Sequence, residues 1–309
     1  MRDSWRSGIR VSLTDSCPFC ITDKHTISSK MSYQATNNNA HHANGSAGHA
    51  IEANENSPLI PKIDENQKQG IRNYANADVR TKRADLVLLF TYITTGLLDS
   101  TATAVWGSFV SMQTGNTVYV GLGLANPTGS TRWIKSGTSI LCFCLGSFLF
   151  ARFHRAFSMR KRWVLIASVL LQTLCVITAA ILITVMPPAH SGTSAPIQWY
   201  VLLSIGLVAF QSAGQAVISR ALKFNSLTSV VLTSIYCDLF MDAELFASFA
   251  KNPERNRRVA APLLLLVGAV MGGAWSHSEI GIQGALWMAA AFKFIVMVIW
   301  AVWPADQKD

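Results

Sequence analysis

From Leu86 to Trp303 the sequence is a nearly continuous series of apolar runs, and this feature constrains the fold more than any other. A helix needs about 20 apolar residues to cross a bilayer. Six runs reach or approach that length, at residues 86–110, 134–154, 163–186, 199–220, 259–276 and 282–303. Because lipid cannot satisfy backbone hydrogen bonds, these runs predict an all-α, polytopic transmembrane helical bundle of about six spans.

The charged residues point to the same class of protein. The chain is 50% hydrophobic and only 14% charged, and its formal net charge is +9. A basic chain could bind nucleic acid, but here the basic residues stand at the ends of apolar runs, which is typical of cytosolic loops and of contact with anionic lipid. We therefore expect the lipid bilayer as a partner, and no nucleic acid.

Two further segments, at residues 112–126 and 226–247, are too short or too polar for an ordinary span. If neither crosses, the basic segments before Leu86 and at 152–162, 220–223 and 251–258 all lie on one side of the membrane. The positive-inside rule then places both termini in the cytosol and makes these segments short and re-entrant. The alternative is an eight-span chain in which both segments cross.

Residues 1–84 are rich in Asn, Ser, His and charge and show no apolar period, so we expect a disordered cytosolic tail followed by a transmembrane domain at 85–309. Within the tail, Glu55, Leu59 and Ile60 fit the acidic dileucine signal that sorting adaptors recognise on vacuolar and lysosomal membrane proteins. The expected location is the vacuolar or plasma membrane.

The transmembrane domain shows a weak internal repeat, with halves at about 85–186 and 199–303. Gln113–Gly115 corresponds to Leu232–Ser234, and Gly146 corresponds to Gly268. Three spans in each half would insert the second half the opposite way round, which is the inverted 3+3 plan of many secondary transporters. Gly268 and Gly272 also form a GxxxG pattern, which predicts close helix packing.

Polar residues recur at helical spacing within two of the spans and predict inward-facing stripes. The stripes are Tyr92, Thr95, Gly96, Asp99 and Thr103 in the first span, and Ser204, Gln211, Gln215 and Ser219 in the fourth. A carboxylate at bilayer depth costs about 2.5 kcal/mol or more, so Asp99 is expected to face a water-accessible cleft between the halves. Lys293, central in the last span, is its candidate partner. The alternatives are a purely structural Asp99–Lys293 pair, and Gln and Thr side chains that only pack helices together.

Thr114, Gly115 and Asn116 open the first short segment, where free amides could hold an anion or unwound carbonyls a cation. The alternative is a tight turn. The complete set of predicted substrate-binding residues is Gly96, Asp99, Thr114, Gly115, Asn116, Gln211, Gln215, Thr233 and Lys293. HExxH, GxSxG and Walker patterns are missing from the sequence, so we expect no enzyme, no cofactor and no metal site.

Three sequence blocks carry a family resemblance. They are Gly96–Asp99, Phe109–Thr117, and Gly214–Gln215 with Arg220 and Thr233. On these residues the region from Leu86 to Trp303 resembles the YoaK-like family of uncharacterised membrane proteins, domain of unknown function 1275, in its fungal-type form. The resemblance implies the membrane fold and names no activity.

The stripes and the repeat favour a secondary transporter or permease-like protein for a small polar solute. In that interpretation, protonation of Asp99, or a cation bound there, is coupled to rocking of the two halves. The alternative is a non-transporting membrane scaffold or assembly factor, in which Lys293 neutralises Asp99.

Overall fold

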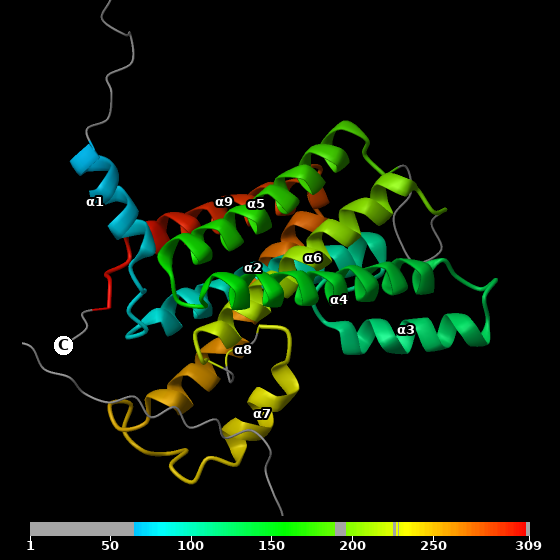
Figure 1. The fold of residues 1–309 in the computed structure, drawn as a ribbon. Helices are drawn as coiled ribbons and strands as arrows, with labels where there is room; N and C mark the ends of the chain where they lie inside the picture. Colours follow the sequence, from blue (N-terminus) through cyan, green and yellow to red (C-terminus); the bar gives the residue numbers. More distant parts are fainter. Residues whose placement is uncertain (1–64, 189–195, 225–226, 228, 307–309) are drawn as a thin grey trace, which may run out of the picture. The chain divides into compact units, whose positions relative to one another are not determined.

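A computed structural model describes residues 65–188, 196–224, 227 and 229–306, and within these ranges the regular secondary structure is helical (Figure 1). The helices are α1 (Glu65–Asn76), α2 (Ala84–Trp106), α3 (Gln113–Ala125), α4 (Arg132–Phe157), α5 (Arg162–Val185), α6 (Trp199–Ala221), α7 (Leu232–Phe240), α8 (Pro253–Ser276) and α9 (Ile282–Val302). The predicted dileucine signal at Glu55, Leu59 and Ile60 lies outside the described residues.

Six of these helices, α2, α4, α5, α6, α8 and α9, are long and apolar enough to cross a membrane, which confirms the predicted all-α bundle of six spans. The short helices α3 and α7 have 13 and 9 residues. The first span ends at Trp106, earlier than expected, because Gly107 turns the chain with a φ of 77°. The fifth begins earlier than expected, at Pro253, where the Asn252 side chain accepts a hydrogen bond from the Arg255 amide (2.9 Å).

Two hydrophobic clusters show which helix ends lie together. One joins the starts of α2 and α5 to the ends of α6 and α9, and the other joins the opposite ends of the same four helices. An ion pair between Arg257 Nε and Asp85 Oδ2 (2.8 Å) places the start of α8 beside the start of α2. The six long helices therefore alternate in direction along the chain.

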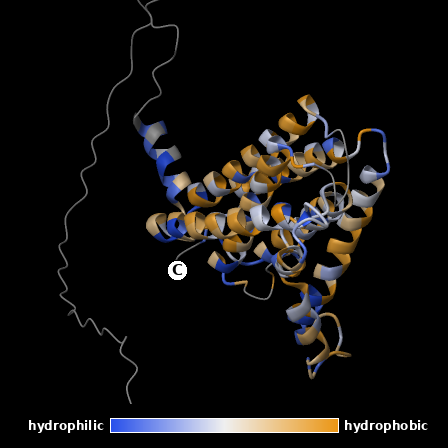
Figure 2. Ribbon diagram, turned by 90° about the vertical axis from the view of Figure 1, so that its right-hand side faces the viewer, coloured by the Kyte–Doolittle hydropathy of each residue, from blue (hydrophilic) through white to orange (hydrophobic). Residues whose placement is uncertain are grey.

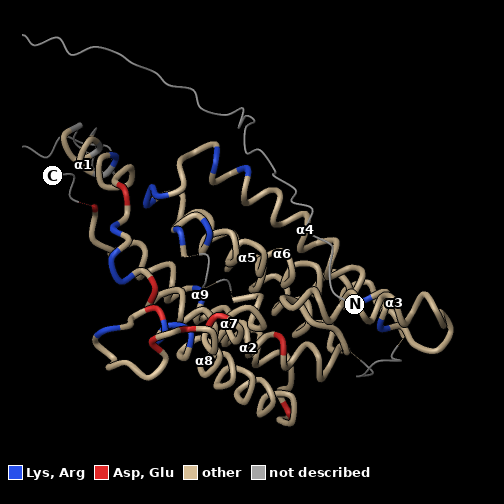
Figure 3. The backbone as a smooth tube through the Cα atoms, turned by 90° about the horizontal axis from the view of Figure 1, so that it is seen from below, with Lys and Arg blue, Asp and Glu red and all other residues tan. Residues whose placement is uncertain are grey.

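Basic residues gather at the end of the bundle where α2, α5 and α8 begin (Figure 3). We call this the basic end, and its residues include Arg80, Lys82, Arg83, Arg152, Arg155, Arg160, Lys161, Arg162, Arg220, Lys223, Lys251, Arg255, Arg257 and Arg258. Arg132 and Lys135 lie at the start of α4, toward the other end. This asymmetry is the one that loop charge predicts for six spans.

The helices pack as α2 on α8 and α4 on α6, while α5 contacts both α6 and α9. Glycines allow two of these crossings. A Cβ atom at Gly268 would lie 2.0 Å from the Ile93 carbonyl oxygen, and one at Gly146 would lie 2.7 Å from the Phe210 carbonyl oxygen. The expected close packing at Gly268 is therefore confirmed, and it joins helices within the bundle.

The long helices are largely hydrophobic along their length (Figure 2), and many of their apolar side chains are exposed. Leu141 on α4 is 72% exposed, and Val270 on α8 is 65% exposed. A bilayer can cover such faces, whereas a soluble monomer rarely exposes contiguous apolar surface of this kind.

The last part of the predicted tail, residues 65–84, contains the helix α1 and a segment that contacts the basic end. The Val79 amide donates to the Arg160 carbonyl (2.8 Å), and the Asp306 amide donates to the Asp78 carbonyl (2.8 Å). Arg162, 1% exposed, stacks 3.7 Å from the centre of the Tyr74 ring and donates to the Tyr74 carbonyl (2.9 Å). These contacts join backbone groups distant in sequence, so a local pattern cannot reveal them.

Replacing Arg162 with Gln is expected to loosen the segment at 74–80 while the bundle stays folded. The change removes the stacking on Tyr74 and hydrogen bonds from a charged donor, each of which contributes about 1.5–3 kcal/mol. Hydrogen exchange measures the result as faster exchange of the amides at 74–80. Arg152→Gln, an exposed arginine on α4, is the control. Unchanged protection of these amides in Arg162→Gln contradicts the role assigned to Arg162.

Candidate functional site

A cluster of polar side chains lies in the interior where α2, α5, α6 and α9 meet. The Lys293 ammonium donates to Gln172 Oε1 (2.8 Å) and to Gln215 Oε1 (2.7 Å). Gln215 Nε2 in turn donates to Thr95 Oγ1 (2.8 Å) and to Ser229 Oγ (2.6 Å). All five side chains are buried. We call them the central polar cluster.

The cluster borders a very small cavity. Its volume is about 10 Å³, and Thr91, Gln172, Gln215 and Lys293 supply its polar lining. A cavity of this size holds about one water molecule. In this conformation the site is therefore closed around its own side chains.

Lys293 is the chemically unusual member of the cluster. It is 1% exposed, and none of the ion pairs within the described ranges involves it. Burying an ammonium is costly unless it is paired, and here the acceptors are two neutral amide oxygens. The cluster thus contains a buried lysine whose amine has no carboxylate partner among the described residues.

The predicted Asp99–Lys293 pair is not formed, and Asp99 does not line the small cavity beside Lys293. Asp99 is 3% exposed. Its Oδ1 accepts hydrogen bonds from the amides of Val110 (2.8 Å) and Ser111 (2.9 Å), and its Oδ2 accepts one from the Ser111 hydroxyl. The carboxylate caps the loop that leads into α3, where free amides and the helix dipole favour a negative charge.

Neither interpretation of the segment at 114–116 describes the structure, because Thr114, Gly115 and Asn116 lie in the first turn of α3 and the chain turns before them, at Gly107. Asn116 is fully buried and binds the Phe109 backbone on both sides, donating to its carbonyl (2.7 Å) and accepting from its amide (3.0 Å). A Cβ atom at Gly115 would lie 2.8 Å from the Phe109 ring, and Thr114 is exposed. The anion at the start of α3 is the protein's own Asp99 carboxylate.

The remaining predicted site residues lie apart from the cluster. Gly96 is a packing residue, because a Cβ atom there would lie 2.0 Å from the Leu265 carbonyl oxygen. Gln211 is buried and donates to Ser212 Oγ (3.0 Å). Thr233 is exposed on α7. Of the nine predicted residues, only Gln215 and Lys293 belong to the cluster.

The polar stripes face the interior except at Thr103, which is half-buried; their buried polar side chains are Tyr92, Thr95, Asp99, Ser204, Gln211, Gln215 and Ser219. The prediction missed Gln172 and Ser229 as members of the site. Gln172 had a usable signal, because it is an amide in the middle of an otherwise apolar run. Ser229 follows α6 in a short connection and carries no such signal.

A chain of polar contacts leads from the cluster toward the basic end. Gln172 Nε2 donates to Ser168 Oγ over a long 3.4 Å, and Ser168 Oγ lies 3.2 Å from His154 Nε2. His154 is one of the residues lining a cavity of about 450 Å³, together with Arg155 and Arg220. This chain of contacts connects Lys293 to a cavity whose lining includes two arginines.

The acidic residue Asp242 lies outside the cluster, in the loop between α7 and α8. It accepts hydrogen bonds from Asn252 Nδ2 (3.1 Å) and pairs with Arg258 NH1 (3.1 Å). Hydrogen bonds from the Glu244 amide and from Asn252 hold the pKa of Asp242 below its ordinary value. Asp242 therefore secures a loop.

Comparison with known proteins gives one match. No curated protein matches the chain, and no solved structure does. A family model described as "Protein of unknown function (DUF1275)" matches residues 87–299, a range that contains α3 to α8, most of α2 and α9, and the whole central polar cluster. The chain is thus an integral, multi-pass membrane protein and belongs to the DUF1275 family.

Proposed function

We propose that this protein is a secondary transporter or permease-like protein for a small polar solute bearing a negatively charged group. The observation that carries the proposal is the buried Lys293 ammonium, held by amides from two other helices and without a carboxylate partner among the described ion pairs. Ionisable residues inside a membrane bundle commonly mark substrate or proton pathways. An anionic solute would supply the charge that the cluster lacks.

The arrangement of the helices supports alternating access by two inverted halves. Helices α2, α4 and α5 correspond to α6, α8 and α9, and each pair runs in opposite directions. The packing of α2 on α8 matches that of α4 on α6. Thr95 and Gln215 are 120 residues apart, close to the 119 residues between Gln113 and Leu232, and they bond to each other. A rocking motion of the halves would therefore act directly on the cluster.

We place the coupling ion at the cluster rather than at Asp99, because both oxygens of Asp99 are engaged by the loop. The contacts through Gln172 and Ser168 to His154 offer a route for a proton between Lys293 and the basic-end cavity. The cavity beside Lys293 is too small for a solute, as expected for an occluded state. One half of the transmembrane domain must move relative to the other before a solute can enter.

The topology that we propose puts the basic end, and with it the N-terminal segment, in the cytosol. This orientation would expose Glu55, Leu59 and Ile60 to sorting adaptors, in agreement with a vacuolar or plasma membrane location.

Lys293→Gln is expected to reduce solute uptake about tenfold or more, because a hydrogen bond from a charged donor contributes about 1.5–3 kcal/mol. The measurement is counterflow in proteoliposomes containing the full-length protein, with labelled carboxylates, phosphates and amino acids screened in turn. Lys223→Gln, an exposed lysine at the basic end, is the control for charge. Unchanged transport by Lys293→Gln would remove Lys293 from the site, and no counterflow of any solute would contradict transport itself.

The scaffold hypothesis has one observation in its favour, which is that the closed cluster leaves only about 10 Å³ of free volume. A scaffold needs no opening of this site. Accessibility of a cysteine introduced at Gln172 separates the two functions: labelling from the aqueous phase indicates a pathway, whereas permanent protection in a folded protein favours a scaffold.

A further inference from the structure

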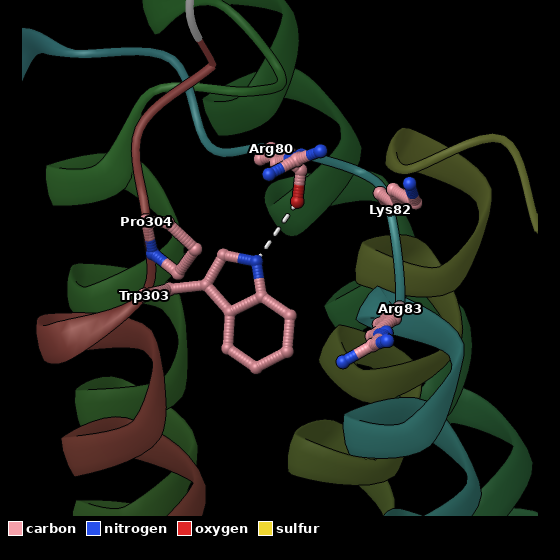
Figure 4. A pocket seen from close by; sticks show the side chains of 5 residues that line it. All are labelled: Arg80, Lys82, Arg83, Trp303 and Pro304. Atoms are coloured by element: carbon pink, nitrogen blue, oxygen red, sulfur yellow. Dashed lines mark hydrogen bonds between the residues drawn. The ribbon is translucent and has the colours of Figure 1, made fainter.

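A second pocket, separate from the central polar cluster, opens at the basic end between the start of α2 and the end of α9 (Figure 4). Its volume is about 420 Å³. Its lining consists of Arg80, Lys82, Arg83, Trp303 and Pro304. The lining thus contains basic and apolar side chains and no acidic one.

The positive charge of this pocket is not neutralised by nearby carboxylates. None of the ion pairs found in the described part of the chain includes Arg80, Lys82 or Arg83. Two nearby carboxylates form ion pairs with other arginines, Asp85 with Arg257 (2.8 Å) and Asp306 with Arg160 (3.7 Å), and Asp78, two residues before Arg80, is in none of the described ion pairs. Three like charges around one pocket repel each other, so an anion bound there would relieve the repulsion.

The wall of the pocket is fixed by Trp303. Its indole Nε1 donates to the Arg80 carbonyl (2.8 Å), which holds the ring between the ends of α9 and α2. Figure 4 shows Arg83 extending from the start of α2 toward this ring. Arg83 also has a φ of 67°, which is uncommon for a residue other than glycine and sets the direction in which its side chain leaves the chain.

The position of the pocket matches the headgroup layer of a bilayer. Trp303 directly follows the last span, and tryptophan favours the membrane interface. Leu86 and Val302, on the adjacent turns of α2 and α9, are 58% and 71% exposed and belong to the apolar outer face. A phosphate between the basic side chains would leave acyl chains free to cover these two residues.

We propose that this pocket binds the phosphate of an anionic lipid headgroup. The proposal rests on insertion of the protein in a membrane and is independent of transport. Guanidinium groups bind phosphate oxygens well, and basic pockets beside transmembrane helices favour anionic headgroups. The apolar surface at Leu86 and Val302 favours a lipid over free phosphate as the source of the anion.

The test is native mass spectrometry of the delipidated full-length protein in detergent, titrated separately with phosphatidylinositol 4-phosphate, phosphatidylcholine and inorganic phosphate. We expect a one-to-one adduct with the anionic lipid. The triple variant Arg80→Gln, Lys82→Gln, Arg83→Gln is expected to bind it about a hundredfold more weakly, since each basic residue contributes about 1 kcal/mol. The matched control is Arg152→Gln, Lys223→Gln, Lys251→Gln, which removes the same number of positive charges from exposed positions at the basic end. Like Arg83, Lys223 has a positive φ, so the control also changes one residue of this backbone conformation.

Two outcomes would overturn the proposal. Equal weakening in both triple variants would assign lipid binding to the overall charge of the basic end. Binding of inorganic phosphate as tight as that of the lipid would make free phosphate the ligand. If the first triple variant does not fold, the double variant Arg80→Gln, Lys82→Gln keeps Arg83 at the start of α2. It is expected to bind the anionic lipid more weakly than the unchanged protein and more tightly than the triple variant.

Discussion

Gly268→Ala is expected to prevent α8 from packing on α2 and to lower the yield and thermal stability of the folded protein severely. The added Cβ would lie 2.0 Å from the Ile93 carbonyl oxygen, and this backbone atom cannot move aside as a flexible side chain can. The two helices must therefore separate along their crossing, at a cost of about 1–3 kcal/mol or more. Fluorescence-detected size exclusion and thermal unfolding in detergent measure the effect.

Gly273→Ala is the matched control, because it makes the same change in the same helix where no atom lies within 4 Å of the new Cβ. Alanine is the better helix former by about 0.5–1 kcal/mol, so this variant is expected to be neutral or slightly stabilised. If both variants behave alike, the close crossing at Gly268 does not hold the bundle together.

The six spans could be predicted from the sequence because their signal, about 20 apolar residues in a row, is local and strong. The close crossing at Gly268 could also be predicted, since a GxxxG pattern is itself a packing signal. The end of the first span could not, because the apolar residues Phe109 and Val110 follow Gly107 although the chain has already left the helix. The helix α1 was missed because its main partner, Arg162, lies 88 residues from Tyr74.

The site was harder to predict, and Asp99 shows why. A carboxylate in an apolar run must have a partner, but the sequence does not say whether that partner is a cation, a cleft or a set of backbone amides. The partners turned out to be the amides of Val110 and Ser111, and amides carry no sequence signature. Lys293 could be recognised because, like Asp99, it is an ionisable residue in an apolar run. Its neighbours Gln172 and Gln215 could not be assigned to it, because the sequence does not determine which helices pack against α9.

Asp99→Ala is therefore expected to destabilise the loop between α2 and α3 strongly. It removes three hydrogen bonds to a buried carboxylate and leaves the amides of Val110 and Ser111 without their acceptor. A buried group that loses its partner costs about 1–3 kcal/mol, so the total loss is about 3 kcal/mol or more. Thermal unfolding measures the total, and hydrogen exchange at residues 107–112 shows whether the loss is local to the loop.

Asp99→Asn provides the sharper comparison, because the amide oxygen of Asn can still accept from both backbone amides. Only the contact with the Ser111 hydroxyl changes, so Asp99→Asn and Ser111→Ala are each expected to cost about 1 kcal/mol, well below Asp99→Ala. The order of stability of the three variants, compared with their uptake, shows whether Asp99 holds the loop or takes part in coupling. If Asp99→Asn keeps its stability but loses pH-dependent uptake, the carboxylate itself takes part in coupling and the assignment of the ion to Lys293 is wrong. If uptake follows stability through the series, Asp99 acts by shaping the loop, and the charge that a solute must meet is the one on Lys293.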